Sequence, residues 1–90
     1  MKAVHLLSRQ QESQSRDEQQ LEFRRRIETL SPRERQVMDG LVAGKASKVI
    51  ARELEISPRT VEVYRAHVMG KTQSRSLSEL VRMALVAGAA

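Results

Sequence analysis

The sequence lacks cysteine and tryptophan, and its 90 residues include one tyrosine and one phenylalanine. Without cysteine there is no disulfide framework and no thiolate ligand for a metal, and a cytoplasmic location is expected. No apolar run approaches the roughly 20 residues that a membrane-spanning helix needs. There is no glycine-rich phosphate loop, and neither His5 nor His67 has a fixed carboxylate partner in the sequence pattern. We therefore expect no enzyme, no metal site, no cofactor and no membrane segment.

Positive charge is what the sequence has in excess. There are 16 Lys and Arg residues against 11 Asp and Glu residues, which gives a net charge of +5. Residues 1–30 are close to balanced, so most of the excess lies in residues 31–90. A basic domain suits a polyanionic partner, and double-stranded DNA is the partner that this composition favours.

Residues 1–29 are predicted to be a linker. Residues 8–20 contain no large apolar side chain, so they cannot bury a face and should be solvated. Residues 1–7 have too short an apolar part for a signal peptide, and we interpret them as the cut end of something longer.

A helix is expected in the second half of this linker. This stretch consists mainly of good helix formers, which predicts a helix over about 12–29. Its large apolar side chains are Leu21, Phe23, Ile27 and, just after it, Leu30. Ile27 and Leu30 would lean on the following domain. A coiled coil is the alternative, but it needs sustained heptads that this segment lacks.

Residues 30–90 are predicted to form one compact all-α domain of four helices. The pairs Ser31-Pro32 and Ser57-Pro58 mark helix starts, because serine caps a helix and proline tolerates its first position. Glu34 completes a capping box with Ser31, and the segment Ser76–Glu79 repeats that spacing. No segment alternates with period two, so no sheet is expected. The predicted helices end at Gly44, within 55–57, at about Lys71 and at about Ala87.

Helical spacing also predicts which side chains face the core. The second predicted helix begins at Ser47 or just before it. In the first two helices the expected core residues are Val37, Met38, Leu41, Val42, Val49, Ile50, Ala51 and Leu54. In the last helix they are Leu77, Leu80, Val81, Ala84 and Leu85, which leaves the apolar Met83 and Val86 on the other face.

The third helix, 58–71, has two different faces. An advance of about 100° per residue puts Val61, Tyr64 and Val68 on one side, together with Thr72 just beyond the helix. The opposite side is mostly small or flat and would lie against a partner. It carries Arg59, Val63, Ala66 and Gly70, flanked by Glu62 and His67.

An α-helix with such a face fits the major groove of B-DNA, and Arg59 lies in its first turn, where a recognition helix commonly reaches bases. Val63 would meet a thymine methyl group, whereas Glu62 either accepts from cytosine N4 or holds Arg59 or Arg65 in place. Arg65 is either a phosphate contact or an ion-pair partner of Glu62 or Glu34, and His67 is expected near phosphate and not as a pH switch. The residues expected near the DNA backbone are Ser47, Lys48, Ser57, Thr60, Arg65, His67, Lys71 and Arg75.

Three segments together resemble the LuxR/FixJ class of helix-turn-helix domains. They are LSPRERQVM at 30–38, SKVIARELEISPRTVEVYRAHVMGK at 47–71 and SLSELVRMAL at 76–85. The resemblance implies a transcription regulator that binds as a dimer to a two-fold DNA site. It places Glu62, Val63 and Ala66 at bases, with Arg59, Thr60, Arg65 and Lys71 near the backbone.

The resemblance also implies further partners. In such regulators the domain follows a phospho-receiver domain and a helical linker, and residues 1–7 then look like the tail of the receiver. RNA polymerase is a further partner of this class. Because the last helix pairs two protomers in the class, we expect Met83 and Val86 to form a small dimer patch.

Three residues depart from the family pattern. Glu55 stands where Gly, Asp or Asn is common at the end of the second helix, and a left-handed backbone there would cost glutamate about 1 kcal/mol. Thr72 replaces Leu or Met, so Thr72→Leu would add about 1 kcal/mol of stability at a dry site. Gly70 weakens its helix by roughly 1 kcal/mol relative to alanine, and it either frays the end or lets a backbone approach closely.

Two rival interpretations remain from the sequence. Region 4 of a sigma factor opens with a similar LSPRERQV-like helix, although residues 8–20 do not resemble the polymerase-binding region that would precede it. A helical protein-interaction module with incidental positive charge is the rival of a different class, and salt dependence of DNA binding would separate it.

Overall fold

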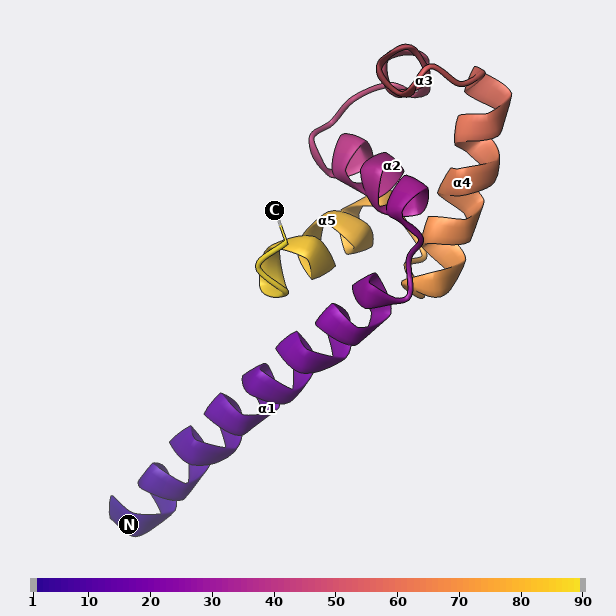
Figure 1. The fold of residues 1–90 in the computed structure, drawn as a ribbon. Coiled ribbons are helices and arrows are strands. Elements are labelled where there is room, and N and C mark those ends of the chain that lie inside the picture. The colour runs from indigo at the N-terminus through magenta and orange to yellow at the C-terminus, as the bar shows by residue number, and fades with distance from the viewer. Residues whose placement is uncertain (1, 90) are drawn as a thin grey trace.

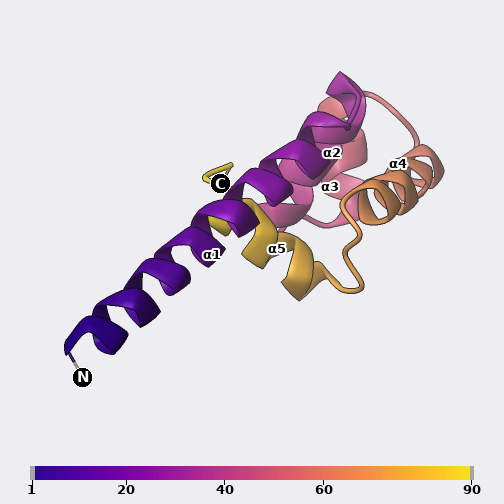
Figure 2. The same cartoon turned by 90° about the horizontal axis from the view of Figure 1, so that it is seen from below.

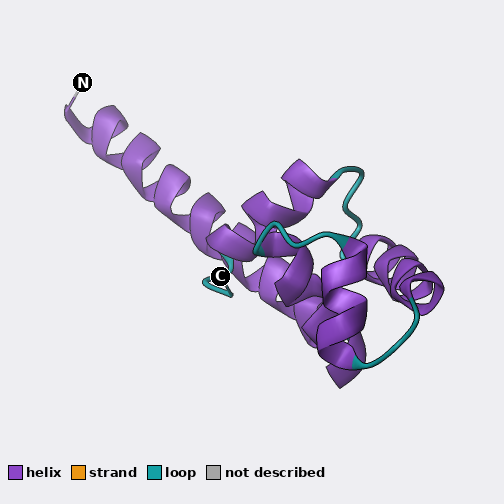
Figure 3. Ribbon diagram, turned by 90° about the horizontal axis from the view of Figure 1, so that it is seen from above, coloured by secondary structure: helices purple, strands orange, loops and turns teal. Residues whose placement is uncertain are grey.

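A computed structural model describes the backbone of residues 2–89 and the side chains of residues 15–89. Its regular secondary structure over that range is all α-helical, as predicted, with a long first helix followed by a four-helix body (Figure 1 and Figure 3). The long helix projects from the body as a rod, and the molecule measures 60 × 21 × 18 Å. The helices are α1 (Lys2–Glu28), α2 (Pro32–Val42), α3 (Ser47–Leu54), α4 (Pro58–Lys71) and α5 (Leu77–Val86).

Helix α1 is longer than predicted, because it begins at Lys2 and not near residue 12. Its first half, residues 2–15, has neither Pro nor Gly, so nothing in it breaks a helix. Residues 15–19 are exposed, which confirms the expected solvation there. The predicted solvation of residues 8–14 concerns side chains outside the described residues, and the assignment of residues 1–7 to the tail of a receiver domain stays a prediction.

Serine residues begin three of the helices of the body. Ser31 and Glu34 form the predicted capping box, with the Ser31 N–H donating to Glu34 Oε1 at 2.8 Å. Ser57 and Ser76 also accept from the backbone N–H three residues later. The second predicted box is only half formed, since Glu79 accepts from the N–H of Arg75 and not from that of Ser76.

The ends of α2 and α3 follow the sequence pattern. Gly44 lies just after α2 with φ of +80°. Glu55 ends α3 in the left-handed region, with φ 57° and ψ 43°. Glu55 therefore carries a conformational cost that the residues common in the family at this position avoid, since glutamate here occupies a backbone conformation that suits glycine.

The core lies where α2, α4 and α5 meet, with α3 packed against α4. Gly40 of α2 allows close packing, because a Cβ there would stand 2.8 and 2.9 Å from two carbons of Ile50. The sequence did not single out Gly40. Val49 was wrongly expected in the core, since it is 39% exposed, and Leu54 is half-buried. The largest fully buried side chains are Met38, Ile50, Leu80, Val37, Val61, Val68 and Thr72.

Helix α5 is rotated relative to the predicted orientation. Met83 is 4% exposed, whereas Leu77 and Leu85 are 39% and 61% exposed. The cause is α1, because its last turns cover the Met83 side of α5. The spacing of apolar residues within α5 contains no information about this contact. Met83 was therefore wrongly assigned to a dimer patch, because a buried side chain cannot meet a second protomer.

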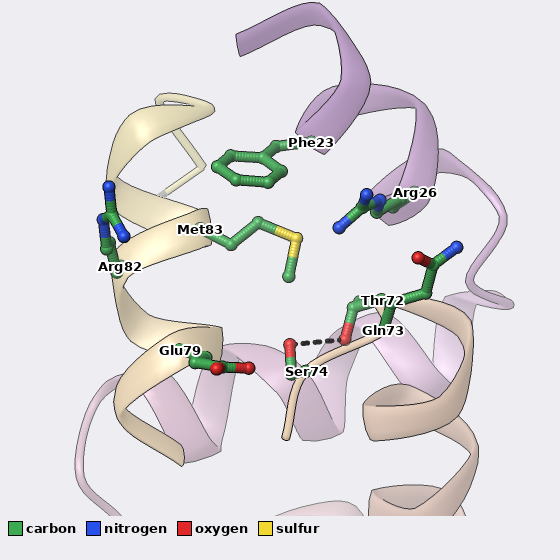
Figure 4. A pocket seen from close by; sticks show the side chains of 8 residues that line it. All are labelled: Phe23, Arg26, Thr72, Gln73, Ser74, Glu79, Arg82 and Met83. Atoms are coloured by element: carbon green, nitrogen blue, oxygen red, sulfur yellow. Dashed lines mark hydrogen bonds between the residues drawn. The ribbon is translucent and has the colours of Figure 1, made fainter. Parts of the chain in front are cut away.

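The junction of α1 with the body is partly polar and partly apolar. Ile27 is buried as predicted, and Arg24 Nε donates to the carbonyl oxygen of Ala87 at 3.0 Å. Beside it lies a small cavity of about 160 Å³ between α1, α5 and the segment that follows α4. Figure 4 shows Phe23 and Met83 meeting across this cavity, with the hydrogen bond between Thr72 and Ser74 at its base.

The Thr72 side chain is shielded from solvent, and its hydroxyl group is hydrogen-bonded. It is fully buried, and its hydroxyl donates to the carbonyl of Val68 at 2.6 Å and pairs with Ser74 at 2.9 Å. The expected gain from Thr72→Leu assumed that burial of the hydroxyl was the whole effect. Leucine would lose both hydrogen bonds, so the basis of that prediction is removed.

Candidate nucleic-acid interface

Helix α4 lies along one edge of the body, away from the free end of α1 (Figure 2). Val61 and Val68 are fully buried, whereas Val63 is 51% exposed and Ala66 is exposed. This is the orientation that the sequence predicted. The face that carries Arg59, Val63 and Ala66 is therefore turned to solvent and is free to lie against a partner.

Helices α3 and α4 form a helix-turn-helix unit. They are joined by residues 55–57 and pack against each other. The left-handed Glu55 reverses the chain, and Ser57 then caps α4 with its hydroxyl on the N–H of Thr60 at 3.1 Å. A turn of this length holds the second helix at a fixed angle to the first, which is the arrangement of DNA-binding helix-turn-helix units.

Several Lys and Arg side chains around this unit form no ion pair within the described residues; we call them the uncommitted cations. Among the side chains that the structure describes, no ion pair involves Lys48, Arg59, Arg65 or Arg75. Arg65 was given two alternatives, and pairing with Glu62 or Glu34 is not observed. Contact with phosphate stays a prediction for Arg65, as it does for the other three.

Glu62 has a partner that the sequence did not suggest. Ser47 Oγ donates to Glu62 Oε1 at 2.5 Å, so the carboxylate is held by α3 and not by Arg59 or Arg65. Ser47 is free for this contact because the cap position of α3 is Ala46, which has no side-chain hydrogen bond. The bond links one residue expected at the DNA backbone to another expected at a base.

Glu34 connects α2 to the far end of α4. Its side chain is 5% exposed, and its oxygens lie 2.7 Å from Lys71 Nζ and 3.3 Å from His67 Nδ1. The hydrogen bond from Lys71, followed by that from the Ser31 N–H, lowers the pKa of Glu34 to about 2. Glu34 therefore stays charged and holds two residues of the candidate interface.

These contacts correct one expectation from the sequence. His67 does have a carboxylate neighbour, which comes from a helix that begins 35 residues earlier in the chain. Glu34 was identified as a capping residue and as a possible partner of Arg65, but its spacing from Ser31 reveals only the cap and nothing about Lys71. No local pattern could have revealed the second role.

The outer face of α5 is apolar. Leu77, Val81, Leu85 and Val86 line a shallow groove on it, together with Ser78 and Arg82. Val86 was expected at the surface of this helix and is partly exposed. The other three apolar residues of the groove, Leu77, Val81 and Leu85, are ones that the sequence placed in the core.

No group of three or more His, Cys, Asp or Glu side chains in the described part of the chain is arranged to hold a metal ion. None of the described helices combines the length and the hydropathy that crossing a membrane requires.

Comparison with known proteins gives a consistent result. Residues 28–84 match the family described as "Bacterial regulatory proteins, luxR family". The chain is 68% identical over 63 residues to "Transcriptional regulatory protein FixJ" of Bradyrhizobium diazoefficiens, covering 70% of this chain and 31% of that protein. It is 56% identical over 84 residues to FixJ of Azorhizobium caulinodans, covering 93% of this chain and 40% of that protein. The chain thus spans well under half the length of these relatives.

Solved structures agree with this assignment. Full-length FixJ from B. japonicum superimposes with a TM-score of 0.78 at 56% identity, covering 84% of this chain and 37% of that one. The C-terminal transcriptional activator domain of FixJ from Sinorhizobium meliloti gives a TM-score of 0.66 at 59% identity, covering 73% and 84%. Since the family match extends over more than half of the residues and includes α2, α3 and α4, the chain belongs to the luxR family of bacterial regulatory proteins.

Proposed function

We propose that this chain binds duplex DNA in a sequence-specific manner, as the output domain of a transcriptional response regulator. The observation that carries the proposal is the orientation of α4, whose valines 61 and 68 are buried while Val63 and Ala66 face solvent. A helix presented in this way enters the major groove with small side chains at its closest approach. The names of the relatives, which include "Response regulator protein TodT" of Pseudomonas putida, support the same function.

Base recognition is assigned to the outward face of α4. Arg59 would donate to guanine, Val63 and Ala66 would contact thymine methyl groups, and Glu62 would accept from an amino group. All four side chains are exposed. They lie on one face of a single helix, which allows them to read successive base pairs of one half-site.

Backbone contacts are assigned to the residues around that face. Lys71 still qualifies although Glu34 binds it, because an ammonium group has three donors and the bond to Glu34 leaves two of them available to a phosphate. The uncommitted cations are placed to neutralise further phosphates. The proposed set is Ser47 and Ser57, through the backbone N–H groups at the starts of α3 and α4, together with Lys48, Thr60, Arg65, His67, Lys71 and Arg75.

Dimerisation on DNA is assigned to α5, with a corrected set of residues. The apolar groove formed by Leu77, Val81, Leu85 and Val86 replaces the patch first centred on Met83. A single helix face is small compared with stable interfaces, so the two protomers would pair mainly when a two-fold DNA site brings them together. We further propose that the full-length chain contains a receiver domain, that RNA polymerase is a partner and that the protein is cytoplasmic.

Selection from random duplexes tests the function directly. We expect an inverted repeat whose affinity falls steeply with salt concentration, because phosphate contacts release counterions. Arg59→Ala should relax selection at one position per half-site, whereas Arg75→Ala should weaken all duplexes equally. Binding that shows no salt dependence would favour the helical protein-interaction module, and a −35-like promoter element bound only with polymerase would favour sigma region 4.

A further inference from the structure

The bond between Ser47 and Glu62 lies inside the proposed interface and has no capping role. It joins the first residue of α3 to the outward face of α4 across 15 residues of sequence. Ala46 occupies the cap position, so the Ser47 hydroxyl is not needed to begin α3. Among the described side chains, Glu62 makes no ion pair that would compete for its carboxylate.

A restrained carboxylate differs from a free one in what it can recognise. An exposed glutamate side chain samples many rotamers, and fixing one of them on binding costs conformational entropy. A hydrogen bond to a charged acceptor is stronger than one between neutral groups, so the Ser47 hydroxyl holds Glu62 before DNA arrives. A carboxylate has about four lone-pair sites, so the anchored group can still accept from a base.

We propose that Ser47 is a positioning residue for base recognition and acts through Glu62. It holds the Glu62 carboxylate where it accepts from the N4 amino group of a cytosine. Guanine and thymine present acceptor oxygens in the major groove, and adenine places its N7 acceptor beside its N6 amino group, so a fixed carboxylate disfavours all three at the same place. This inference rests on the proposed DNA-binding function and adds to it the identity of one preferred base and the residue that enforces the preference.

The alternative role of Ser47, direct donation to a phosphate, predicts a different pattern. Loss of a phosphate contact weakens binding to every duplex by one factor, because the backbone carries no sequence information. Loss of positioning leaves most positions unchanged and relaxes selection only where Glu62 reads. The two roles are therefore separated by the ratio of affinities and not by affinity itself.

The experiment uses the duplex recovered by site selection and all of its single-base substitutions. Dissociation constants are measured at one salt concentration for the wild type, Ser47→Ala, Ser47→Thr, Glu62→Gln and the Ser47→Ala/Glu62→Gln double variant. Glu28→Gln is the control for net charge, since Glu28 is an exposed residue of α1, outside α3 and α4. Thermal melting of each variant checks that the fold is kept.

We expect the wild type to prefer cytosine at one position per half-site by roughly tenfold, the size of one good base contact. Ser47→Ala should lower that single ratio to the value of Glu62→Gln, and Ser47→Thr should retain it. In the Glu62→Gln background, Ser47→Ala should leave the ratio unchanged, and Glu28→Gln should change no ratio.

Two results would overturn the inference while leaving the proposed function standing. One is an equal loss of affinity for all duplexes in Ser47→Ala. The other is a change in the ratio that is as large in the Glu62→Gln background as in the wild type. If the wild type selects no duplex at all, the proposed function fails first and the inference with it.

Discussion

Lys71 Nζ lies 2.7 Å from Glu34 Oε1, which ties the last turn of α4 to the first turn of α2. The two residues are 37 positions apart, and Glu34 also accepts from the N–H of Ser31. One carboxylate thus caps α2 and fixes the end of the helix proposed to read DNA. Removing it would affect both elements.

The pH dependence of stability should report this carboxylate. The pKa of Glu34 is lowered from 4.5 to about 2 in the folded protein, so its charged form stabilises the fold. That stabilisation is complete above the unfolded pKa and is lost as pH falls from about 4.5 towards 2. Urea unfolding at a series of pH values should therefore show a steeper loss of stability for the wild type than for Glu34→Gln. Parallel curves for the two proteins would contradict this role of Glu34.

Two glycines in helices should respond oppositely to the same substitution. At Gly70 an added Cβ meets nothing within 4 Å, so Gly70→Ala should stabilise the protein by about 1 kcal/mol. At Gly40 an added Cβ clashes with Ile50, so Gly40→Ala should destabilise it by about 1–3 kcal/mol. Chemical denaturation measures both, and each variant serves as the control for the other. Weaker DNA binding by the stabilised Gly70→Ala protein would show that the DNA backbone approaches this glycine closely.

Glu55→Gly should leave stability unchanged or raise it by up to about 1 kcal/mol. The left-handed backbone at Glu55 suits glycine, and the substitution removes that steric cost. Arg52→Gly is the matched control, because Arg52 is exposed but lies within α3, where glycine costs about 1 kcal/mol. A clear drop in melting temperature for Glu55→Gly would refute the left-handed conformation.

The corrected α5 face predicts a contrast between two apolar residues. Leu85→Glu should keep the monomer folded, because Leu85 is 61% exposed, but should reduce binding to a two-fold site more than to a half-site. Met83→Glu should lower stability by several kcal/mol, because it places a carboxylate in the core. Circular dichroism melts and gel shifts with both duplexes measure the two effects. Equal loss of half-site and full-site binding by Leu85→Glu would exclude a role in pairing.

Much of the fold follows from local chemistry. The pairs Ser31-Pro32 and Ser57-Pro58 fix two helix starts, because a cap and a ring-restrained backbone act within one turn. The orientation of α4 was predicted from the stripe formed by Val61, Tyr64 and Val68, and the structure buries both valines of this stripe.

The errors have a common physical origin. The rotation of α5 depends on α1, which covers Met83 and is not part of the pattern within α5. The contacts of Glu62 with Ser47 and of Glu34 with Lys71 arise only after the helices pack. A periodicity shows which face of a helix is apolar, but it does not show which neighbour a polar side chain will meet.

Helix α1 projects from the body in its first half (Figure 1) and is a structural part of the body in its last turns, because Ile27 lies in the core and Arg24 binds the carbonyl of Ala87. Limited digestion with trypsin should reflect this division. Cleavage after the exposed Arg16 trims the rod and leaves a resistant fragment, whereas cleavage after Arg25 takes away the Arg24 contact and weakens the attachment of α5. The shortest fragment that persists in such a digest should therefore begin upstream of Phe23.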